Sequence, residues 1–194
     1  MQAFPDRSPL ALFLKPCHSV RMKQRIALIG LFLTVPLPML ASPGTVCSFH
    51  AVDVDDRSLT EEDLRGHVTI LFYETKDGGA KSRKLKDDMN SAYAVQPPAL
   101  QAAMRRLGVI NAASAPTLLR PFVKTGIREA SRREGVPLYI DWDGSVGEAC
   151  GLKRPSGTTV ALFDRKGRLR LLFDGATAQA DTVIAEVARL MAEH

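Results

Sequence analysis

Runs of apolar and β-branched residues, separated by polar turns, predict the strands of this chain. Residues 68–73 are almost continuously apolar, which is typical of a central strand buried on both faces. Residues 159–163 and 169–173 flank a short polar turn, and this arrangement predicts a β-hairpin. Three shorter strands are expected at residues 48–54, 109–110 and 138–141.

Apolar residues spaced three or four positions apart predict four helices. Their apolar faces are Leu85, Met89 and Tyr93 in the first; Leu100, Met104 and Leu107 in the second; Phe122, Val123, Gly126, Ile127 and Ala130 in the third; and Val183, Ile184, Val187, Leu190 and Met191 in the last. Pro98 and Pro121 suit the first positions of the second and third helices. Upstream, Thr60 is suited to cap a short helical turn that ends at Gly66.

The order of these elements predicts the fold class. Strands and helices alternate in the first part of the chain, which favours parallel strands at the centre of an α/β sheet. The closing hairpin adds antiparallel strands, and the last helix packs on one face. The sequence therefore predicts an α/β protein with a central mixed sheet, a C-terminal hairpin and helices on both faces.

The N-terminal part of the chain has the three-part pattern of a secretory signal peptide. After Met22 come Lys23 and Arg25, then an uncharged apolar run at residues 26–40, then small residues at 41–44. The apolar run is shorter than the roughly 20 residues that a membrane span needs, and two prolines interrupt it.

We therefore expect residues 22–41 to be a signal peptide that is cleaved near Ala41. The mature protein would be periplasmic or secreted, with no stable membrane anchor after processing; a retained anchor and a buried apolar segment are the alternatives. Residues 1–21 precede the signal and are interpreted as a mis-annotated or disordered extension. Residues 42–194 then form a single domain.

Composition and charge narrow the class of protein. Hydrophobic residues make up 45% of the chain and charged residues 24%, which excludes a disordered or low-complexity protein. The net charge is +5, but residues 1–41 hold five basic residues and one acidic residue. Residues 42–194 therefore hold 21 basic and 20 acidic residues. The body is nearly neutral, and we expect no nucleic acid among its partners.

Several stretches resemble the thioredoxin fold in its exported, peroxiredoxin-related branch. They are LRGHVTILFYET at residues 64–75, GVPLYIDWDG at 135–144 and TTVALFDRKGRL at 158–169. More narrowly, the chain is similar to the small YtfJ-like family of exported proteins. Those similarities lie at residues 116–128, 152–153, 162–169 and 173–176. The resemblance covers roughly residues 46–192 and implies a thioredoxin-like three-layer fold.

The chain departs from that fold at the redox site. Thioredoxins carry a Cys-x-x-Cys pair where the buried strand meets the next helix, whose N-terminus lowers the pKa of the first thiol. Here this place reads Asp77, Gly78, Gly79, Ala80, and none of these residues can form a thiolate. Thr158 also stands where the fold normally has a cis-proline. The resemblance thus implies a fold retained without thiol–disulfide chemistry.

Two cysteines remain after export, Cys47 and Cys150. An oxidising compartment favours one disulfide between them, which would close a loop of about 100 residues. Two buried free thiols and a catalytic pair are the alternatives that the sequence leaves open.

The segment from Asp77 to Ser82 lies between a strand and a helix, where some folds bind phosphate. A nucleotide-binding loop would need two glycines that Thr75 and Ala80 replace, so nucleotide hydrolysis is excluded. A milder anion site is conceivable, because backbone N–H groups would be joined by nearby basic side chains. Those side chains are Lys76, Lys81, Arg83 and Lys84. The plainer reading is a solvated basic face.

No other pattern indicates a metal or a cofactor. His50 and His67 lack partners at ligand spacing, and His67 suits a turn before the central strand. The stretch at residues 141–144 resembles the start of a calcium loop, but Ser145 stands where a further ligand is needed, so a strand-ending turn is expected. Trp142 would cap the end of the sheet or stack on a ligand.

The sequence favours an exported binding or accessory module without enzymatic activity. Its expected binding surface comprises Asp77, Gly78, Gly79, Ala80, Lys81 and Thr158, and its partner would be a periplasmic protein or a small anionic ligand. The alternative is a thiol–disulfide oxidoreductase, or a peroxiredoxin-like antioxidant, that uses Cys150 or Cys47. A purely structural role also remains open.

Overall fold

The structure is a computed structural model that describes residues 44–193. The expected extension at residues 1–21, the signal peptide at residues 22–41 and the cleavage near Ala41 lie outside the described residues. None of the described helices is long and apolar enough to cross a membrane.

A seven-stranded mixed sheet forms the centre of the molecule, in the order β2-β1-β5-β4-β3-β6-β7. Its strands are β1 (His50–Val52), β2 (Ser58–Thr60), β3 (Val68–Glu74), β4 (Met104–Asn111), β5 (Leu138–Asp141), β6 (Thr158–Phe163) and β7 (Leu169–Asp174). The central strands β3, β4 and β5 are parallel, while β6 and β7 add the expected antiparallel hairpin at one edge. Every residue of β3 is buried, which confirms its predicted central place.

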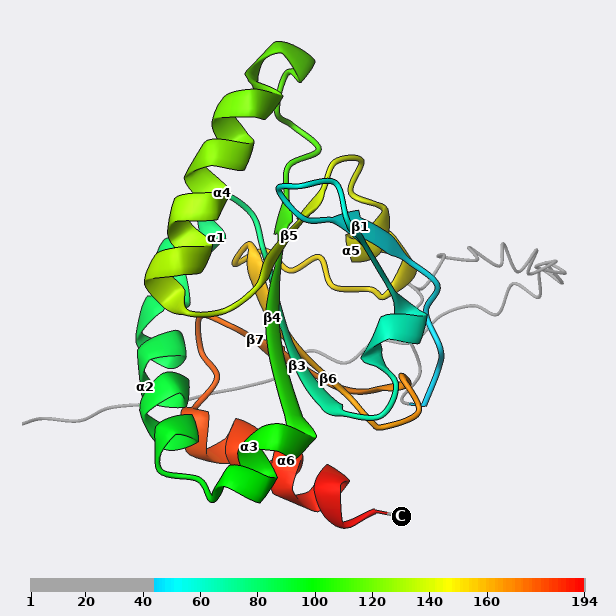
Figure 1. Ribbon diagram of the computed structural model, residues 1–194, viewed down its shortest axis with the longest axis vertical. Coiled ribbons are helices and arrows are strands. Elements are labelled where there is room, and N and C mark those ends of the chain that lie inside the picture. Colours follow the sequence, from blue (N-terminus) through cyan, green and yellow to red (C-terminus); the bar gives the residue numbers. More distant parts are fainter. Residues whose placement is uncertain (1–43, 194) are drawn as a thin grey trace, which may run out of the picture. The chain divides into compact units, whose positions relative to one another are not determined.

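Helices cover both faces of this sheet (Figure 1). They are η1 (Glu61–Leu64), α1 (Gly78–Lys81), α2 (Arg83–Ala94), α3 (Pro98–Ala103), η2 (Thr117–Leu119), α4 (Arg120–Glu134), α5 (Ser145–Ala149) and α6 (Ala180–Ala192). One face packs against α2, α4 and α6; the other is covered by η1, α5 and the segment before β1. The predicted α/β architecture is confirmed.

One predicted helix was wrong in extent. Pro98 does begin a helix, but it ends at Ala103, and both Met104 and Leu107 belong to β4 instead. The reason is tertiary: β4 pairs with β3 in parallel from Val68↔Met104 onward, and this ladder buries Leu107 completely. Burial in the sheet outweighs the helical spacing of the apolar residues.

Four short elements were not predicted: β2, α1, η2 and α5. All are brief, and none carries a periodic apolar pattern of its own. The Thr60 cap does form: its backbone N–H donates to the Asp63 carboxylate at 2.8 Å at the start of η1.

Candidate functional site

The candidate site lies at the carboxyl edge of β3, β4 and β5, where open α/β sheets present ligand sites. Residues 75–82 lead from β3 into α2. The sequence predicted a loop over residues 76–80, but the chain already forms a helical turn from Gly78, with the Ser82 N–H donating to the Gly78 carbonyl at 3.2 Å.

This turn is clamped against the segment that precedes β6. A Cβ atom on Gly78 would lie 1.9 Å from the Gly157 carbonyl oxygen, so no larger residue fits there without a backbone shift. The Thr75 N–H donates to the same carbonyl at 2.8 Å, and the Lys81 Nζ donates to the Ser156 carbonyl at 2.9 Å. The structure thus brings the predicted 77–81 segment beside the residues that lead into Thr158.

The predicted site residues differ in exposure. Asp77, Ala80 and Lys81 are exposed, whereas Gly78 and Thr158 are buried. The N–H groups of Gly78 and Gly79 both donate to the Thr75 carbonyl, so they are already engaged within the turn. Any anion at this edge would therefore rely on side-chain cations rather than on these amides.

A buried carboxylate lies directly beneath the turn. Glu74, the last residue of β3, is 2% exposed. Its Oε1 accepts hydrogen bonds from the Ser82 hydroxyl and, at 3.4 Å, from Thr158 Oγ1, and its Oε2 accepts one from Lys86 Nζ at 2.7 Å. Lys86 also donates to Glu134 at 3.2 Å. This network joins β3, α2, β6 and α4 under the candidate site.

A second polar network occupies the opposite face of the same strand. Tyr73 donates from its hydroxyl to Asp141 Oδ2 at 3.0 Å and accepts from Asn111 Nδ2 at 2.7 Å. Burial and the neighbouring Asp141 charge raise the pKa of Tyr73. Burial also raises the pKa of Asp141, although the Tyr73 hydrogen bond opposes that rise. The phenol is therefore neutral and serves as a donor within the core.

The stretch at residues 141–144 forms a strand-ending turn. Asp141 accepts hydrogen bonds from the N–H groups of Gly144, at 2.9 Å, and Gly147, at 3.4 Å. The Trp142 ring lies under the Arg120 guanidinium, 4.7 Å from the ring centroid. Within residues 44–193, no group of His, Cys, Asp or Glu is placed to hold a metal ion.

The two cysteines are joined away from the candidate site. Cys47 and Cys150 form a disulfide that connects the segment before β1 to the end of α5. Both are buried, at 4% and 0% exposure, in the core cluster that also holds Val146 and Leu152. Neither sulfur lies in the turn at residues 77–81.

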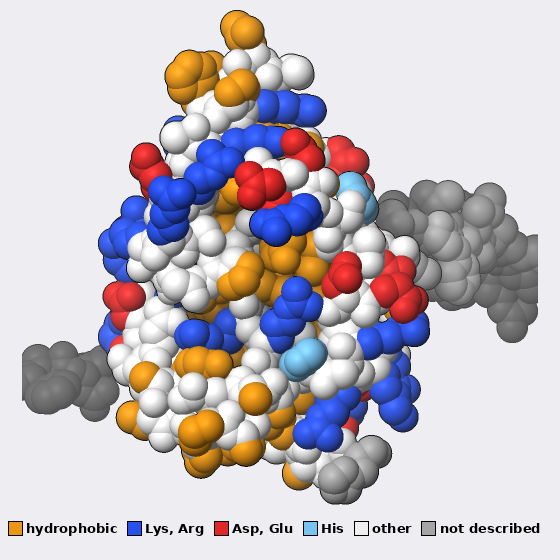
Figure 2. Space-filling view, in the orientation of Figure 1, with side chains coloured by type: hydrophobic (Ala, Val, Ile, Leu, Met, Phe, Trp, Pro, Cys, Tyr) orange, Lys and Arg blue, Asp and Glu red, His pale blue; other side chains and the backbone are white. Residues whose placement is uncertain are grey.

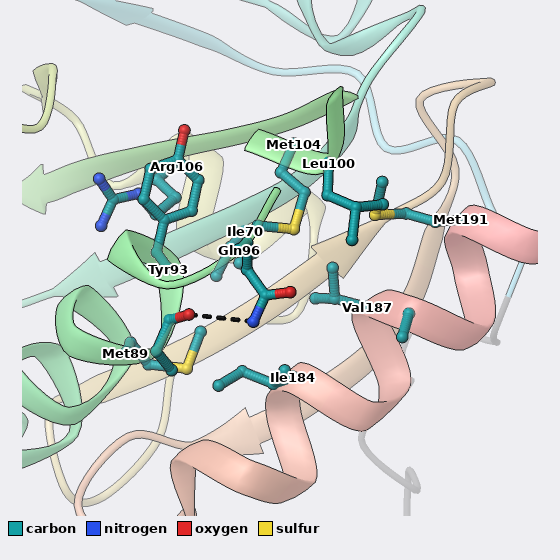
Figure 3. Close-up of a pocket in the computed structure, with 12 residues that line it drawn as sticks. Ile70, Met89, Tyr93, Gln96, Leu100, Met104, Arg106, Ile184, Val187 and Met191 are labelled. Carbon is teal, nitrogen blue, oxygen red and sulfur yellow. Dashed lines mark hydrogen bonds between the residues drawn. The ribbon is translucent and has the colours of Figure 1, made fainter. Parts of the chain in front are cut away.

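An apolar cavity of about 110 Å³ lies near the other end of the sheet, between α2, α3, β4 and α6 (Figure 3). Three methionines, Met89, Met104 and Met191, contribute to its lining. The Arg106 guanidinium stacks on the Tyr93 ring at 3.8 Å, and in Figure 3 this pair lies to one side, away from Leu100 and Met191. This cavity brings no reactive groups together.

Glu74, Lys86, Tyr73 and Asp141 were missed from the sequence. Glu74 ends an apolar run and resembles the solvent-facing end of a strand. Only the packing of α2 and β6 over it shows that the carboxylate is buried.

Comparison with known proteins supports the fold. No protein-family model and no curated protein matches the chain. Among solved structures, the exposed lipoprotein thioredoxin of Streptococcus pneumoniae is 15% identical, with a TM-score of 0.57, covering 73% of this chain and 98% of that one. A DsbF homologue of Corynebacterium diphtheriae is 15% identical, with a TM-score of 0.54, covering 74% and 84%. A secreted thiol-disulfide isomerase of Corynebacterium glutamicum is 13% identical, with a TM-score of 0.53, covering 77% and 86%.

At such low identity these likenesses show the fold and nothing narrower. The fold is thioredoxin-like, as the sequence predicted.

Proposed function

We propose that this protein is an exported, non-redox binding module with a thioredoxin-like fold, similar to the YtfJ-like family. One observation carries the proposal: residues 77–80, between β3 and α2, contain no cysteine and form a turn in which Gly78 packs against Gly157. Without a thiolate at this place the reductase chemistry of the fold has no nucleophile. Function follows the site and not the fold.

The edge around this turn is suited to a partner. Lys76, Lys81 and Arg83 are exposed there, and they favour an acidic protein surface or a small anion. At the same edge of the sheet, η2 and the first turn of α4 carry large apolar side chains in solvent: Leu118 is 85% exposed and Phe122 is 74% exposed. Exposed apolar groups of this size mark interaction surfaces. Secreted and surface-exposed proteins among the structural neighbours agree with an exported role.

The second candidate function is a thiol–disulfide oxidoreductase that uses Cys47 and Cys150. The observation that favours it is the disulfide itself, together with neighbours whose names describe thiol–disulfide exchange. Burial opposes it, because an exchanging disulfide must be reached by an attacking thiolate. Under native conditions a phosphine reductant should leave the pair intact, whereas rapid native reduction would favour this second function.

Two arms test the binding edge. In the first, inorganic phosphate is titrated into ¹⁵N-labelled protein. Saturable changes in the backbone chemical shifts of residues 76–83 support an anionic ligand if binding weakens in Lys81→Gln. The control is Lys166→Gln on the β6–β7 turn, which should leave binding unchanged. In the second, a photo-crosslinking residue replaces Ala80, with Ala185 on α6 as the exposed control. A discrete adduct specific to position 80 in the exporting host supports a protein partner. Failure of both arms contradicts the proposal.

A further inference from the structure

A cleft lies between α4, the turn that joins β1 to β2, and the start of β5. Its volume is about 590 Å³, within the range of roughly 300–1,000 Å³ that small-molecule sites occupy. β1 ends at Val52 and pairs with β5 only at Val52↔Ile140, so the ladder between these two strands does not extend to Leu138 and Tyr139. Leu138 and Tyr139 line the space beyond that pair.

The walls of the cleft are tied together before any ligand binds. Asp55 in the β1–β2 turn accepts from the Arg128 guanidinium at 3.0 Å, and Asp56 accepts from Lys124 Nζ at 2.5 Å. The turn itself is ordered by Asp53, whose Oδ1 accepts the N–H groups of Asp55 and Arg57 at 2.8 and 2.9 Å. A preformed cleft lowers the ordering cost of binding.

The floor and the rim of the cleft differ in chemistry. The floor is apolar and consists of Val54, Val136, Pro137, Leu138 and the Tyr139 ring. Figure 2 shows apolar side chains between α4 and the β1 region, with basic and acidic side chains around them.

Three guanidinium groups line the rim, from Arg57, Arg128 and Arg132. Arg57 is paired with Asp53 at 2.7 Å and Arg128 with Asp55, so two carboxylates face three cations. Arg132 makes no ion pair with any residue in the described part of the chain. A free guanidinium fork beside an apolar floor matches a carboxylate or phosphate that carries a compact apolar group.

We propose that this cleft binds a small organic anion. Its apolar group would lie on Leu138 and Tyr139, and its carboxylate or phosphate would pair with Arg132, with Arg128 adjacent. This inference is independent of the proposed function, because the cleft shares no lining residue with the turn at residues 77–81.

The test uses three probes that share a phenyl ring: benzoate, phenyl phosphate and the neutral benzyl alcohol. Each is titrated into ¹⁵N-labelled protein at constant ionic strength, and backbone shifts are followed. We expect saturable binding of at least one anion, with shifts at residues 53–58 and 128–139, and none of benzyl alcohol at equal concentration. Benzoate binding alone would identify a carboxylate ligand, and phenyl phosphate binding alone a phosphate ester.

The matched variants are Arg132→Gln and Arg133→Gln, consecutive exposed residues of α4 of which only the first lines the cleft. Arg132→Gln should weaken anion binding about fivefold, as expected for the loss of one partly exposed ion pair. Arg133→Gln should leave the dissociation constant within about twofold of the wild-type value. Unchanged circular dichroism would show that both variants fold. Absence of saturable anion binding, equal binding of benzyl alcohol, or equal weakening by the two variants would overturn the proposal.

Discussion

Removal of the Cys47–Cys150 disulfide should cost several kcal/mol of stability. The bond joins residues 103 positions apart, so it removes the entropy of a long loop from the unfolded chain. The loop-entropy relation gives about 4.7 kcal/mol for a loop of this length at 25 °C, and native disulfides typically contribute about 2–5 kcal/mol. Because both side chains are buried, alanine at each position also leaves a small void that adds to the cost.

The comparison is urea unfolding of the mature wild type against Cys47→Ala/Cys150→Ala, followed by circular dichroism. We expect the free energy of unfolding to fall by about 3–5 kcal/mol in the variant. A phosphine reductant added to the unfolding series should bring the wild type to the level of the variant and should leave the variant unchanged. A difference below about 1 kcal/mol, or two free thiols in wild type isolated from the exporting compartment, would refute a structural bridge.

Three further predictions concern the turn at residues 77–81 and the turn between β6 and β7. Gly78→Ala should destabilise the protein by about 1–3 kcal/mol, because the new Cβ meets a backbone carbonyl. Gly126→Ala on α4 has open space around it and should stabilise the protein by about 0.5–1 kcal/mol. Thermal melts of both variants test this, and equal effects would contradict the close packing of Gly78 on Gly157. Asp77→Cys/Ala80→Cys should form a reversible disulfide under mild oxidant, and mass spectrometry after alkylation measures it. Cysteines that stay reduced in a folded protein would show that the turn does not match the redox motif of the fold. Asp164→Asn should cost about 1–3 kcal/mol at pH 7. Burial raises the pKa of Asp164, but N–H donors of the β6–β7 turn and a neighbouring arginine outweigh burial and lower it. The stabilisation is thus present above the usual value of 3.8 and is lost as the pH falls below it. The unfolding curves of the two proteins should therefore converge at acidic pH, and a constant difference would contradict this.

Elements with strong patterns could be predicted from the sequence. The apolar run of β3 and the turn between β6 and β7 leave few alternatives, because local preference and burial agree there. The boundary between α3 and β4 could not be predicted, since Met104 and Leu107 fit a helical face and a strand alike. Only pairing with β3 decides between them.

The position proposed for the candidate site comes from the sequence, and its construction comes from the structure. That residues 77–80 contain no cysteine can be read directly from the sequence. The clamp on Gly157 and the burial of Glu74 depend on contacts across about 80 residues of sequence, which no local pattern encodes. The pairing of the two cysteines also depends on a contact between residues far apart in the chain. The sequence alone therefore left three interpretations open: a disulfide, two free thiols or a catalytic pair.

The central claim is that a thioredoxin-like fold persists here without thiol–disulfide chemistry. Its most direct measurement is the reduction of insulin disulfides by the purified mature protein with dithiothreitol as electron source, beside a thioredoxin as positive control and the Cys150→Ala variant. We predict a rate equal to the uncatalysed background for both wild type and variant. Wild-type turnover above background that disappears in Cys150→Ala would contradict the claim and establish the buried pair as a redox centre.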